Sequence, residues 1–330
     1  MLGFSVLERG RHLTVRARAK VNLGLEVLGR RADGYHELLT FLAAIDLADR
    51  VTLETIQPEA PGSSGIEVAC DAPGVPRGRD NLAWRAAELI RREGQVRVGA
   101  RIRIAKAIPV AAGLGGGSAD AAAVLVGLSR LWGLSLAPAR LLALATKLGM
   151  DVPFFLGQSP ALGADRGERL AAVPPHQSLA VVLVNPGFPL PTRDVYARLR
   201  PVDFTDGTRV RTLVAALGDG AAAVASRVVN GLEPAALSLW PGLGDVKAAL
   251  LDAGALGAVM SGSGPTVIGI AASRAAALRI RAALATGGGP RWSVWVARTV
   301  AGPVLSIGDG EDAGPAKARR QEAAWGVAKR

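Results

Sequence analysis

Cysteine is almost absent from the sequence, since Cys70 is the only one among 330 residues. A single cysteine excludes an internal disulfide and any metal site built from several thiolates. The three histidines, His12, His36 and His176, lie far apart and lack the spacing of metal ligands. Aromatic residues make up 4% of the chain, which argues against a stacking surface for single-stranded nucleic acid. This cysteine usage fits a reducing, cytoplasmic compartment.

Long apolar runs are missing too. No stretch of 18 or more strictly apolar residues occurs, and residues 1–11 lack the apolar core of a signal peptide. We therefore expect no membrane span and no membrane partner. Lysine and arginine number 39 against 28 acidic residues, a net charge of +11. Because the basic residues are scattered, we interpret them as a solvated surface and expect no nucleic acid partner.

Glycine, by contrast, is abundant at 41 residues, and apolar residues make up 49% of the chain. Apolar residues alternate over residues 13–27 and 96–104, as in half-buried strands. Helical spacing occurs over 80–92, where Asp80 is the expected N-cap, and again from Ser118. This mixed order predicts an α+β fold with mixed or antiparallel sheets.

The length suggests two domains or one large one, and we expect two lobes. We expect an N-terminal lobe for ATP binding and catalysis over residues 1–160. A C-terminal lobe would span 161–300, and its last strand could return to the first lobe. From residue 301 the apolar periodicity is lost, and 301–330 is predicted to be a poorly ordered tail.

The most informative segment is a glycine-rich loop between a predicted strand and a predicted helix. Residues 109–122 read PVAAGLGGGSADAA. In that position, free backbone N–H groups and the positive end of the helix dipole can bind a phosphate together. The loop lacks the lysine of a P-loop, and Ser118 stands where the Rossmann pattern needs glycine. Four glycines in five positions exceed what a structural turn requires.

This loop resembles the second motif of the GHMP kinase superfamily. Three further segments resemble its other motifs in the expected order: residues 17–25 (ARAKVNLGL), 149–155 (GMDVPFF) and 261–267 (SGSGPTV). The sequence ADGYH at residues 32–36 resembles one branch of the family, which acts in the non-mevalonate isoprenoid pathway. Ala119 departs from the usual Ser-Ser-Asp or Ser-Ser-Asn run, which puts one phosphate hydrogen bond in doubt.

The resemblance implies a two-lobed GHMP kinase-like fold and an ATP-dependent small-molecule kinase that uses ATP and Mg²⁺. In that branch the γ-phosphoryl group goes to the 2-hydroxyl of a cytidine-diphosphate-linked methylerythritol. Asp151 matches the family's general base, and Lys20 matches the lysine that stabilises charge. No carboxylate trio suggests a protein metal site, so phosphate and water would coordinate Mg²⁺. We expect a monomer or a homodimer.

The resemblance also assigns binding residues. Tyr35 would offer a ring face to the pyrimidine, His36 would hydrogen-bond its edge, and Tyr196 would lie on the opposite face. The full substrate-binding set is Asn22, Tyr35, His36, Asp151, Thr192 and Tyr196. The cofactor-binding set is Asn81, Lys106, Pro109, Ala111, Ala112, Gly113, Leu114, Gly115, Gly116, Gly117, Ser118 and Ala119. The turn at residues 261–264 is expected to support the glycine loop.

Two alternatives stay open. Another GHMP kinase, acting on homoserine or mevalonate, would share the glycine loop and Asp151, although Tyr35, His36 and Tyr196 favour a cytidyl substrate. A non-catalytic nucleotide-binding regulator would bind ATP without transferring its γ-phosphate. Product release measured with each alcohol distinguishes these possibilities.

Overall fold

The computed structural model describes residues 12–58, 65–174, 176–287, 289 and 291–309. Its first elements are β1 (His12–Arg30), β2 (His36–Ile56), β3 (Ile66–Cys70), α1 (Leu82–Glu93), β4 (Gly99–Ala105), α2 (Gly116–Leu131), α3 (Pro138–Leu148), α4 (Val152–Phe155), β5 (Gln158–Ser159), β6 (Ala161–Ala164) and β7 (Arg169–Ala172). No helix in these described ranges is long and apolar enough to cross a membrane.

The remaining elements follow along the chain. They are β8 (Ala180–Asn185), α5 (Thr192–Tyr196), η1 (Pro201–Asp203), α6 (Thr208–Ala215), η2 (Ala216–Gly218), α7 (Ala221–Ala225), β9 (Val229–Asn230), α8 (Glu233–Leu239), α9 (Leu243–Asp252), β10 (Gly257–Met260), β11 (Val267–Ala271), α10 (Arg274–Gly287), β12 (Ser293–Val300), β13 (Gly302–Pro303) and β14 (Leu305–Asp309). The two η elements are short 3₁₀ helices.

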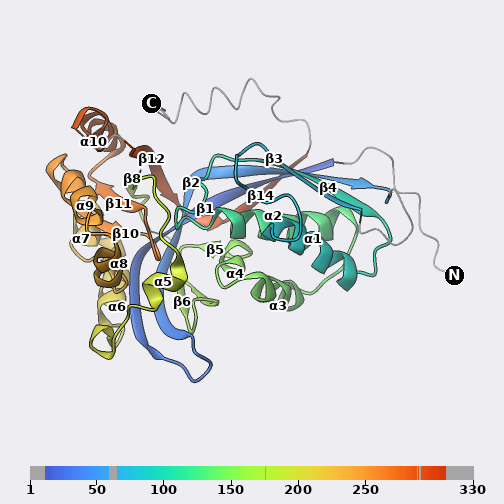
Figure 1. Ribbon diagram of the computed structural model, residues 1–330, viewed down its shortest axis with the longest axis horizontal. Helices are drawn as coiled ribbons and strands as arrows, with labels where there is room; N and C mark the ends of the chain where they lie inside the picture. Colours follow the sequence, from blue (N-terminus) through green and yellow to red (C-terminus); the bar gives the residue numbers. More distant parts are fainter. Residues whose placement is uncertain (1–11, 59–64, 175, 288, 290, 310–330) are drawn as a thin grey trace.

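The long antiparallel pair of β1 and β2 connects the two halves of the molecule (Figure 1). The half-buried alternation predicted for residues 13–27 is confirmed in the first part of β1, where Val15 and Ala17 are fully buried and the residues between them are partly exposed. From residue 19 to 27 both faces of the strand are buried, so the alternation does not extend there. The pairing shifts register between Arg18 and Lys20 and again after Asn22. Such bulges bend a strand locally, which explains how one 19-residue strand remains continuous through the site.

One sheet passes through both halves in the strand order β10-β11-β8-β12-β2-β1-β14. Strand β12 joins them, because it pairs with β8 over residues 293–298 and with β2 through Thr299 and Val300. Strands β6 and β7 add to the first half through β2. Residues 161–172 therefore extend the first part of the sheet, and the lobe bounds 1–160 and 161–300 stay a prediction.

Helices α1, α2 and α3 lie together on one side of the first half of the sheet (Figure 1). Helix α2 packs against β1 and β2, and its Ala- and Gly-rich sequence permits a close approach. At Gly127 an added Cβ would lie 2.2 Å from Leu53 Cδ1. The buried α2 thus fixes the glycine loop before it against the sheet.

The helix starts differ slightly from those predicted. Helix α1 is capped by Asn81 rather than Asp80, since Asn81 Oδ1 accepts the Ala83 N–H at 2.8 Å. Helix α2 begins at Gly116, two residues before the predicted start at Ser118. The glycines at its first turn obscured this start, because glycine disfavours a helix interior.

The predicted tail is wrong for residues 305–309. Strand β14 pairs there with residues 13–17 of β1 and completes that edge of the sheet. The preceding Val304 is fully buried, and Leu305 and Ile307 pack against the main core. These few apolar residues among glycine and charged residues were too short a pattern to detect. Residues 310–330 lie outside the described residues.

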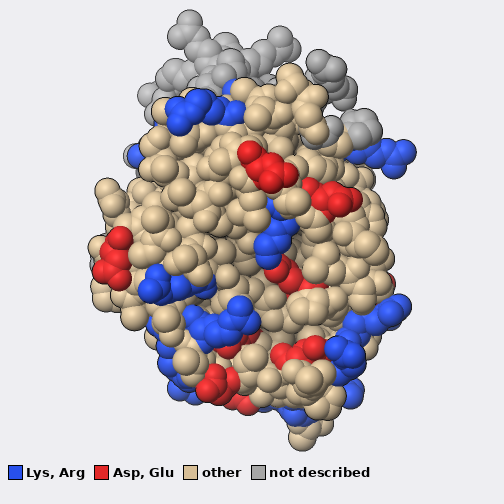
Figure 2. Space-filling model, turned by 90° about the vertical axis from the view of Figure 1, so that its left-hand side faces the viewer, with Lys and Arg blue, Asp and Glu red and all other residues tan. Residues whose placement is uncertain are grey.

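The charged residues on one face support the interpretation of a solvated surface. Figure 2 shows Lys and Arg interspersed with Asp and Glu on this face. Many of the arginines are paired locally, such as Arg200 with Asp203 at 3.4 Å.

Candidate active site

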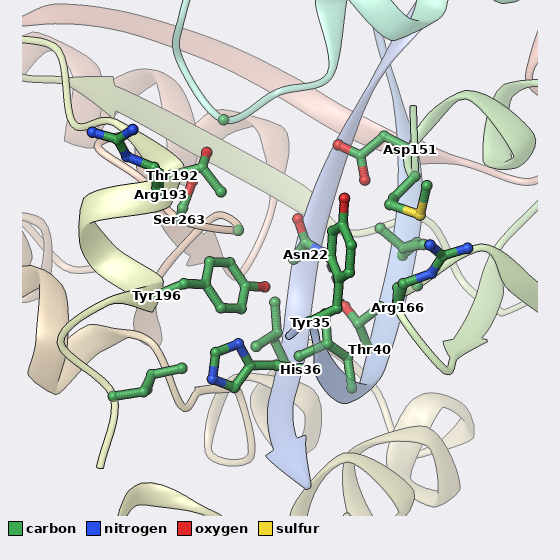
Figure 3. A pocket seen from close by; sticks show the side chains of 18 of the residues that line it. Asn22, Tyr35, His36, Thr40, Asp151, Arg166, Thr192, Arg193, Tyr196 and Ser263 are labelled. Atoms are coloured by element: carbon green, nitrogen blue, oxygen red, sulfur yellow. Dashed lines mark hydrogen bonds between the residues drawn. The ribbon is translucent and has the colours of Figure 1, made fainter. Parts of the chain in front are cut away.

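A cavity of about 990 Å³ opens where the β1–β2 pair, the glycine loop and α5 meet (Figure 3). It brings together both predicted catalytic residues and the complete predicted substrate-binding set: Lys20, Asp151, Asn22, Tyr35, His36, Thr192 and Tyr196. From the glycine loop it receives Gly113, Gly115 and Ser118. Residues more than 170 positions apart in the sequence therefore share one cavity.

Lys20 and Asp151 form an ion pair inside this cavity. Lys20 Nζ lies 3.5 Å from Asp151 Oδ2, and the Lys20 side chain is 5% exposed while that of Asp151 is 46% exposed. Asp151 directly precedes α4, but its carboxyl group makes no capping hydrogen bond to that helix. The carboxylate is therefore held by the ammonium group and remains accessible to a ligand in the cavity.

Asn22 positions the Lys20 ammonium from the same strand. Lys20 Nζ donates to Asn22 Oδ1 at 2.7 Å, and Asn22 Nδ2 donates to Thr40 Oγ1 at 2.9 Å. The Thr40 hydroxyl donates in turn to the Gly24 carbonyl. This chain of hydrogen bonds fixes which end of the Asn22 amide faces the lysine.

The glycine loop has the backbone shape of an anion-binding turn. Ala111, Gly113 and Gly115 have φ values of 54°, 74° and 72°, and α2 begins immediately afterwards. The first N–H groups of a helix lack acceptors within it, and the helix dipole is positive there. The loop therefore offers donors for a phosphate, as its sequence predicts.

The turn at residues 261–264 supports this loop, as expected. Ser261 Oγ donates to the Gly113 carbonyl and accepts the Asn22 N–H, both at 3.3 Å. A Cβ at Gly113 would lie 2.7 Å from the Ser261 carbonyl oxygen. A Cβ at Gly262 would lie 3.3 Å from Lys20 Nζ. Glycine at these positions lets three backbone segments meet around the lysine.

Aromatic and imidazole side chains gather at the other end of the cavity (Figure 3). The His36 and Tyr196 rings have centroids 5.2 Å apart with a 35° tilt, and Phe204 approaches His36 edge-on. Burial, and secondarily the charge of Arg30, lowers the pKa of His36 below its ordinary value. Burial, with the negative charge of Asp151, raises the pKa of Tyr196, which therefore remains a phenol. This end can hold a planar, uncharged group.

Known proteins are similar to this chain in sequence and in fold. The GHMP kinases N terminal domain matches residues 81–158, and the GHMP kinases C terminal domain matches 212–289. The 4-diphosphocytidyl-2-C-methyl-D-erythritol kinase of Pelotomaculum thermopropionicum is 46% identical over 271 residues, which are 82% of this chain and 93% of that protein. That of Citrifermentans bemidjiense is 43% identical over 87% of this chain and 99% of its own length. The chain belongs to the 4-diphosphocytidyl-2-C-methyl-D-erythritol kinase family of GHMP kinases.

Solved structures agree with this assignment. A crystal structure of 4-(cytidine 5'-diphospho)-2C-methyl-D-erythritol kinase matches with a TM-score of 0.73 and 38% identity, over 87% of this chain and 98% of that one. The homoserine kinase of Cytophaga hutchinsonii matches with a TM-score of 0.70 at 23% identity, over 93% of this chain and 100% of that one. The latter supports the fold alone. The predicted GHMP kinase fold and kinase class are confirmed.

Several predicted cofactor residues do not line the cavity. Asn81 uses its side chain at the α1 N-terminus and donates to the Pro76 carbonyl. The side chains of Ala112, Leu114 and Ala119 are buried in the core. At position 119 the methyl group therefore faces the protein interior, and such residues could contact a nucleotide only through their backbone. The other loop residues that do not line it are Pro109, Ala111, Gly116 and Gly117.

Lys106 is also withdrawn from the cavity. Its ammonium group donates to Asp49 at 2.5 Å and to Asp120 at 2.9 Å, and its side chain is 7% exposed. Lys106 continues the even-numbered positions that are apolar over residues 96–104, and its burial explains why a lysine follows that pattern. The prediction that it contacts the nucleotide stays a prediction.

The sequence interpretation missed Arg166. This residue lies in the turn between β6 and β7, and its guanidinium group lies 5.2 Å from the centre of the Tyr35 ring. Glu168 accepts from Arg166 Nε at 2.9 Å and Nη2 at 2.8 Å, which fixes the guanidinium group (Figure 3 shows it beside Tyr35). Arg30 and Arg193 also line the cavity. The pairing of β6 with β2 and the hydrogen bond from the Leu38 N–H to the Asp165 carbonyl bring this turn to the site, and no local pattern shows that pairing.

Proposed function

We propose that this kinase transfers the γ-phosphoryl group of ATP to the 2-hydroxyl of 4-diphosphocytidyl-2-C-methyl-D-erythritol, in the non-mevalonate isoprenoid pathway. The observation that carries the proposal is the Lys20–Asp151 ion pair inside the cavity between the glycine loop and the aromatic end. Relatives that carry this substrate in their names match the chain over most of its length.

The two ends of the cavity suggest how the substrates are oriented. Backbone N–H groups of the glycine loop and of the first turn of α2 would bind the ATP phosphates. His36 would hydrogen-bond the edge of the cytosine, and Tyr196 and Tyr35 would contact its faces. The acceptor hydroxyl would then lie beside Asp151. Since a tertiary hydroxyl is a crowded nucleophile, this orientation would supply much of the rate.

Asp151 would accept the proton of the 2-hydroxyl as oxygen attacks the γ-phosphorus. Lys20 would stabilise the negative charge that develops on the transferred group and on the attacking oxygen. The hydrogen bond from Lys20 to Asn22 keeps the ammonium group pointed at this position. Asn22 would therefore serve both the lysine and the substrate.

Mg²⁺ fits this site as a companion of the nucleotide. Among the residues that the structure describes, no group of three or more His, Cys, Asp or Glu side chains could hold a metal ion. Mg²⁺ bound by phosphates and water is common in kinases, and it would neutralise phosphate charge. We further propose a cytoplasmic enzyme. We also propose a monomer or a homodimer.

Steady-state ADP release tests the proposal. The purified protein with Mg-ATP is incubated with 4-diphosphocytidyl-2-C-methyl-D-erythritol, homoserine or mevalonate. We expect release with the cytidyl compound alone. Turnover of another alcohol, with none of the cytidyl compound, would keep the kinase class and refute the substrate.

A further inference from the structure

A buried group of three charged side chains lies directly beneath the glycine loop. Lys106 Nζ is 2.5 Å from Asp49 Oδ2 and 2.9 Å from Asp120 Oδ2. The exposed fractions of the three side chains are 7%, 0% and 6%. A Cβ at Gly116, the first residue of α2, would lie 3.1 Å from the same Nζ. The group is therefore packed against the turn that would bind the phosphates.

The two carboxyl groups are not equivalent. Asp49 accepts three hydrogen bonds: its Oδ1 accepts the N–H groups of Ala107 and Ile108 at 2.7 and 2.8 Å, and its Oδ2 accepts Lys106. Asp120 accepts one, from Lys106, and its Oδ1 is buried without a partner. Hydrogen-bond donors stabilise the ionised form of a carboxyl group. Asp49 is thus the better carboxylate of the two.

The charges of this group do not balance when every member is ionised. Two carboxylates and one ammonium leave one buried negative charge, and uncompensated buried charges are costly. Both carboxyl groups contact the same Lys106 ammonium group, so they lie close to each other. Two carboxyl groups at such a distance disfavour double ionisation, and one of them retains a proton.

We propose that Asp120 carries this proton on the acid side of neutral pH and loses it on the alkaline side, so that the group of Asp49, Lys106 and Asp120 beneath the phosphate-binding loop is neutral only while Asp120 is protonated. Asp120 then acts as a positioning residue for nucleotide binding. It keeps Lys106 in place without adding negative charge near the phosphates. This inference rests on the proposed binding of ATP by the loop.

The electrostatic environment agrees with this assignment. Burial, with the negative charge of Asp49, outweighs the attraction of Lys106 and raises the pKa of Asp120 to about 7. Among the described residues, the charged groups that act on Asp120 are Lys106, which follows β4, and Asp49 of β2. Cys70 and Asp71 lie next to them at the end of β3. The carboxyl group of Asp71 accepts the Lys106 N–H.

The proposal predicts a pH dependence of nucleotide affinity. As pH rises through the pKa of Asp120, the group gains a negative charge close to the phosphates and ADP binding weakens. The substitution D120N replaces a neutral acid by a neutral amide of the same shape, so it should remove this dependence. ADP has a phosphate that titrates in the same range, but this contribution cancels when the two proteins are compared.

Binding of Mg-ADP measured by calorimetry between pH 6 and pH 8.5 is the test. We expect D120N to bind within about twofold of wild type at pH 6, and wild type to lose about three- to tenfold more affinity than D120N by pH 8.5. The matched control is D71N, which removes a carboxylate next to the group and should keep the wild-type pH dependence. The substitution D49N should weaken ADP binding more than tenfold, because an amide cannot accept all three donors.

A second measurement does not depend on nucleotide. The infrared carbonyl band of a protonated carboxyl group should be present in ligand-free wild type at pH 6, disappear by pH 8.5, and be absent from D120N. Equal pH profiles for wild type and D120N, without this band, would overturn the inference. The band without any ADP binding would instead refute the proposed function and leave the protonation standing.

Discussion

The two ends of the cavity are built in opposite ways. The phosphate end is the one at the glycine loop, and the base end, formed by Tyr35, His36 and Tyr196, is the one that would hold the cytosine base. At the phosphate end, backbone segments from β1, the glycine loop and the turn at residues 261–264 meet so closely that a Cβ at Gly113 or Gly115 would clash. At the base end, the site is made of side chains on separate elements, and Tyr35 is 53% exposed. The first end depends on backbone shape and the second on side-chain surface.

This difference suggests a division of labour. Phosphate is common to all reactions of ATP-dependent kinases, and a rigid loop preorganises the donors for it. Side chains at the base end can change one at a time without disturbing the core, so substrate choice can vary there. Substitutions at the phosphate end should therefore lower kcat or abolish binding, whereas those at the base end should mainly raise KM for the alcohol.

The largest effect is expected at Asp151, the proposed general base. The substitution Asp151→Asn should lower kcat by about 10³-fold, because an amide cannot accept the hydroxyl proton. KM for both substrates should change little. The matched control is Asp194→Asn, which removes a similarly exposed carboxylate from α5 outside the cavity. Retention of more than a tenth of kcat in Asp151→Asn would exclude the role of general base.

The next effect tests the backbone of the phosphate end. The substitution Gly115→Ala would place a Cβ 2.7 Å from the Phe155 ring and 2.9 Å from Lys20 Cγ, at a φ of 72°. Strain and overpacking together should cost about 2–4 kcal/mol, and KM for ATP should rise at least about tenfold.

Gly133→Ala is the control for this substitution. Gly133 has a φ of 65°, but a Cβ there would meet nothing within 4 Å. It should lose about 1–2 kcal/mol of unfolding free energy from the backbone alone and keep wild-type kinetics. Similar kinetics for the two variants would show that close packing at Gly115 does not matter for nucleotide binding.

The sequence was sufficient for much of the phosphate end. The strand alternation around Lys20 and Asn22 and the glycine-rich start of α2 are local patterns, and local patterns follow from backbone geometry. The family motifs added Asp151 and the turn at residues 261–264. The pairing of β14 with β1 was not predictable in this way, because five residues without clear periodicity find their place only through the edge that they cover.

The base end was only partly predictable. The motif at residues 32–36 predicts Tyr35 and His36 as binding residues. The residues around them come from the turn between β6 and β7 and from the segment after α5. Arg166 and Phe204 reach the site through tertiary pairing. The position of Lys106 beneath the loop was not predicted for the same reason. Its two partners, Asp49 and Asp120, are 57 and 14 residues away in the sequence.

A smaller effect is expected at Tyr196. The substitution Tyr196→Leu removes a ring that lies 5.2 Å from His36 and that would contact the base. Loss of one stacking partner costs about 1–3 kcal/mol, so KM for the cytidyl substrate should rise about tenfold while kcat stays within twofold. Tyr196→Phe keeps the ring and should lose much less. A fall in kcat at unchanged KM would mean that Tyr196 belongs with the catalytic end.

The smallest effect is a pH dependence at His36, which separates the base end from the phosphate end by titration. Because its pKa is lowered by burial and by Arg30, His36 is neutral at pH 7 and gains a proton only as pH falls below its ordinary range. KM for the cytidyl substrate should therefore be constant from pH 7 to pH 8.5. Below pH 6 it should rise by about three- to tenfold, as one hydrogen bond to the base edge is lost.

In His36→Gln, which cannot titrate, KM should be higher at pH 7 but independent of pH. KM for ATP, measured in the same series, should not rise below pH 6, because His36 lies at the far end of the cavity from the glycine loop. If KM for the cytidyl substrate still rises below pH 6 in His36→Gln, the titrating group is another one and His36 does not recognise the base.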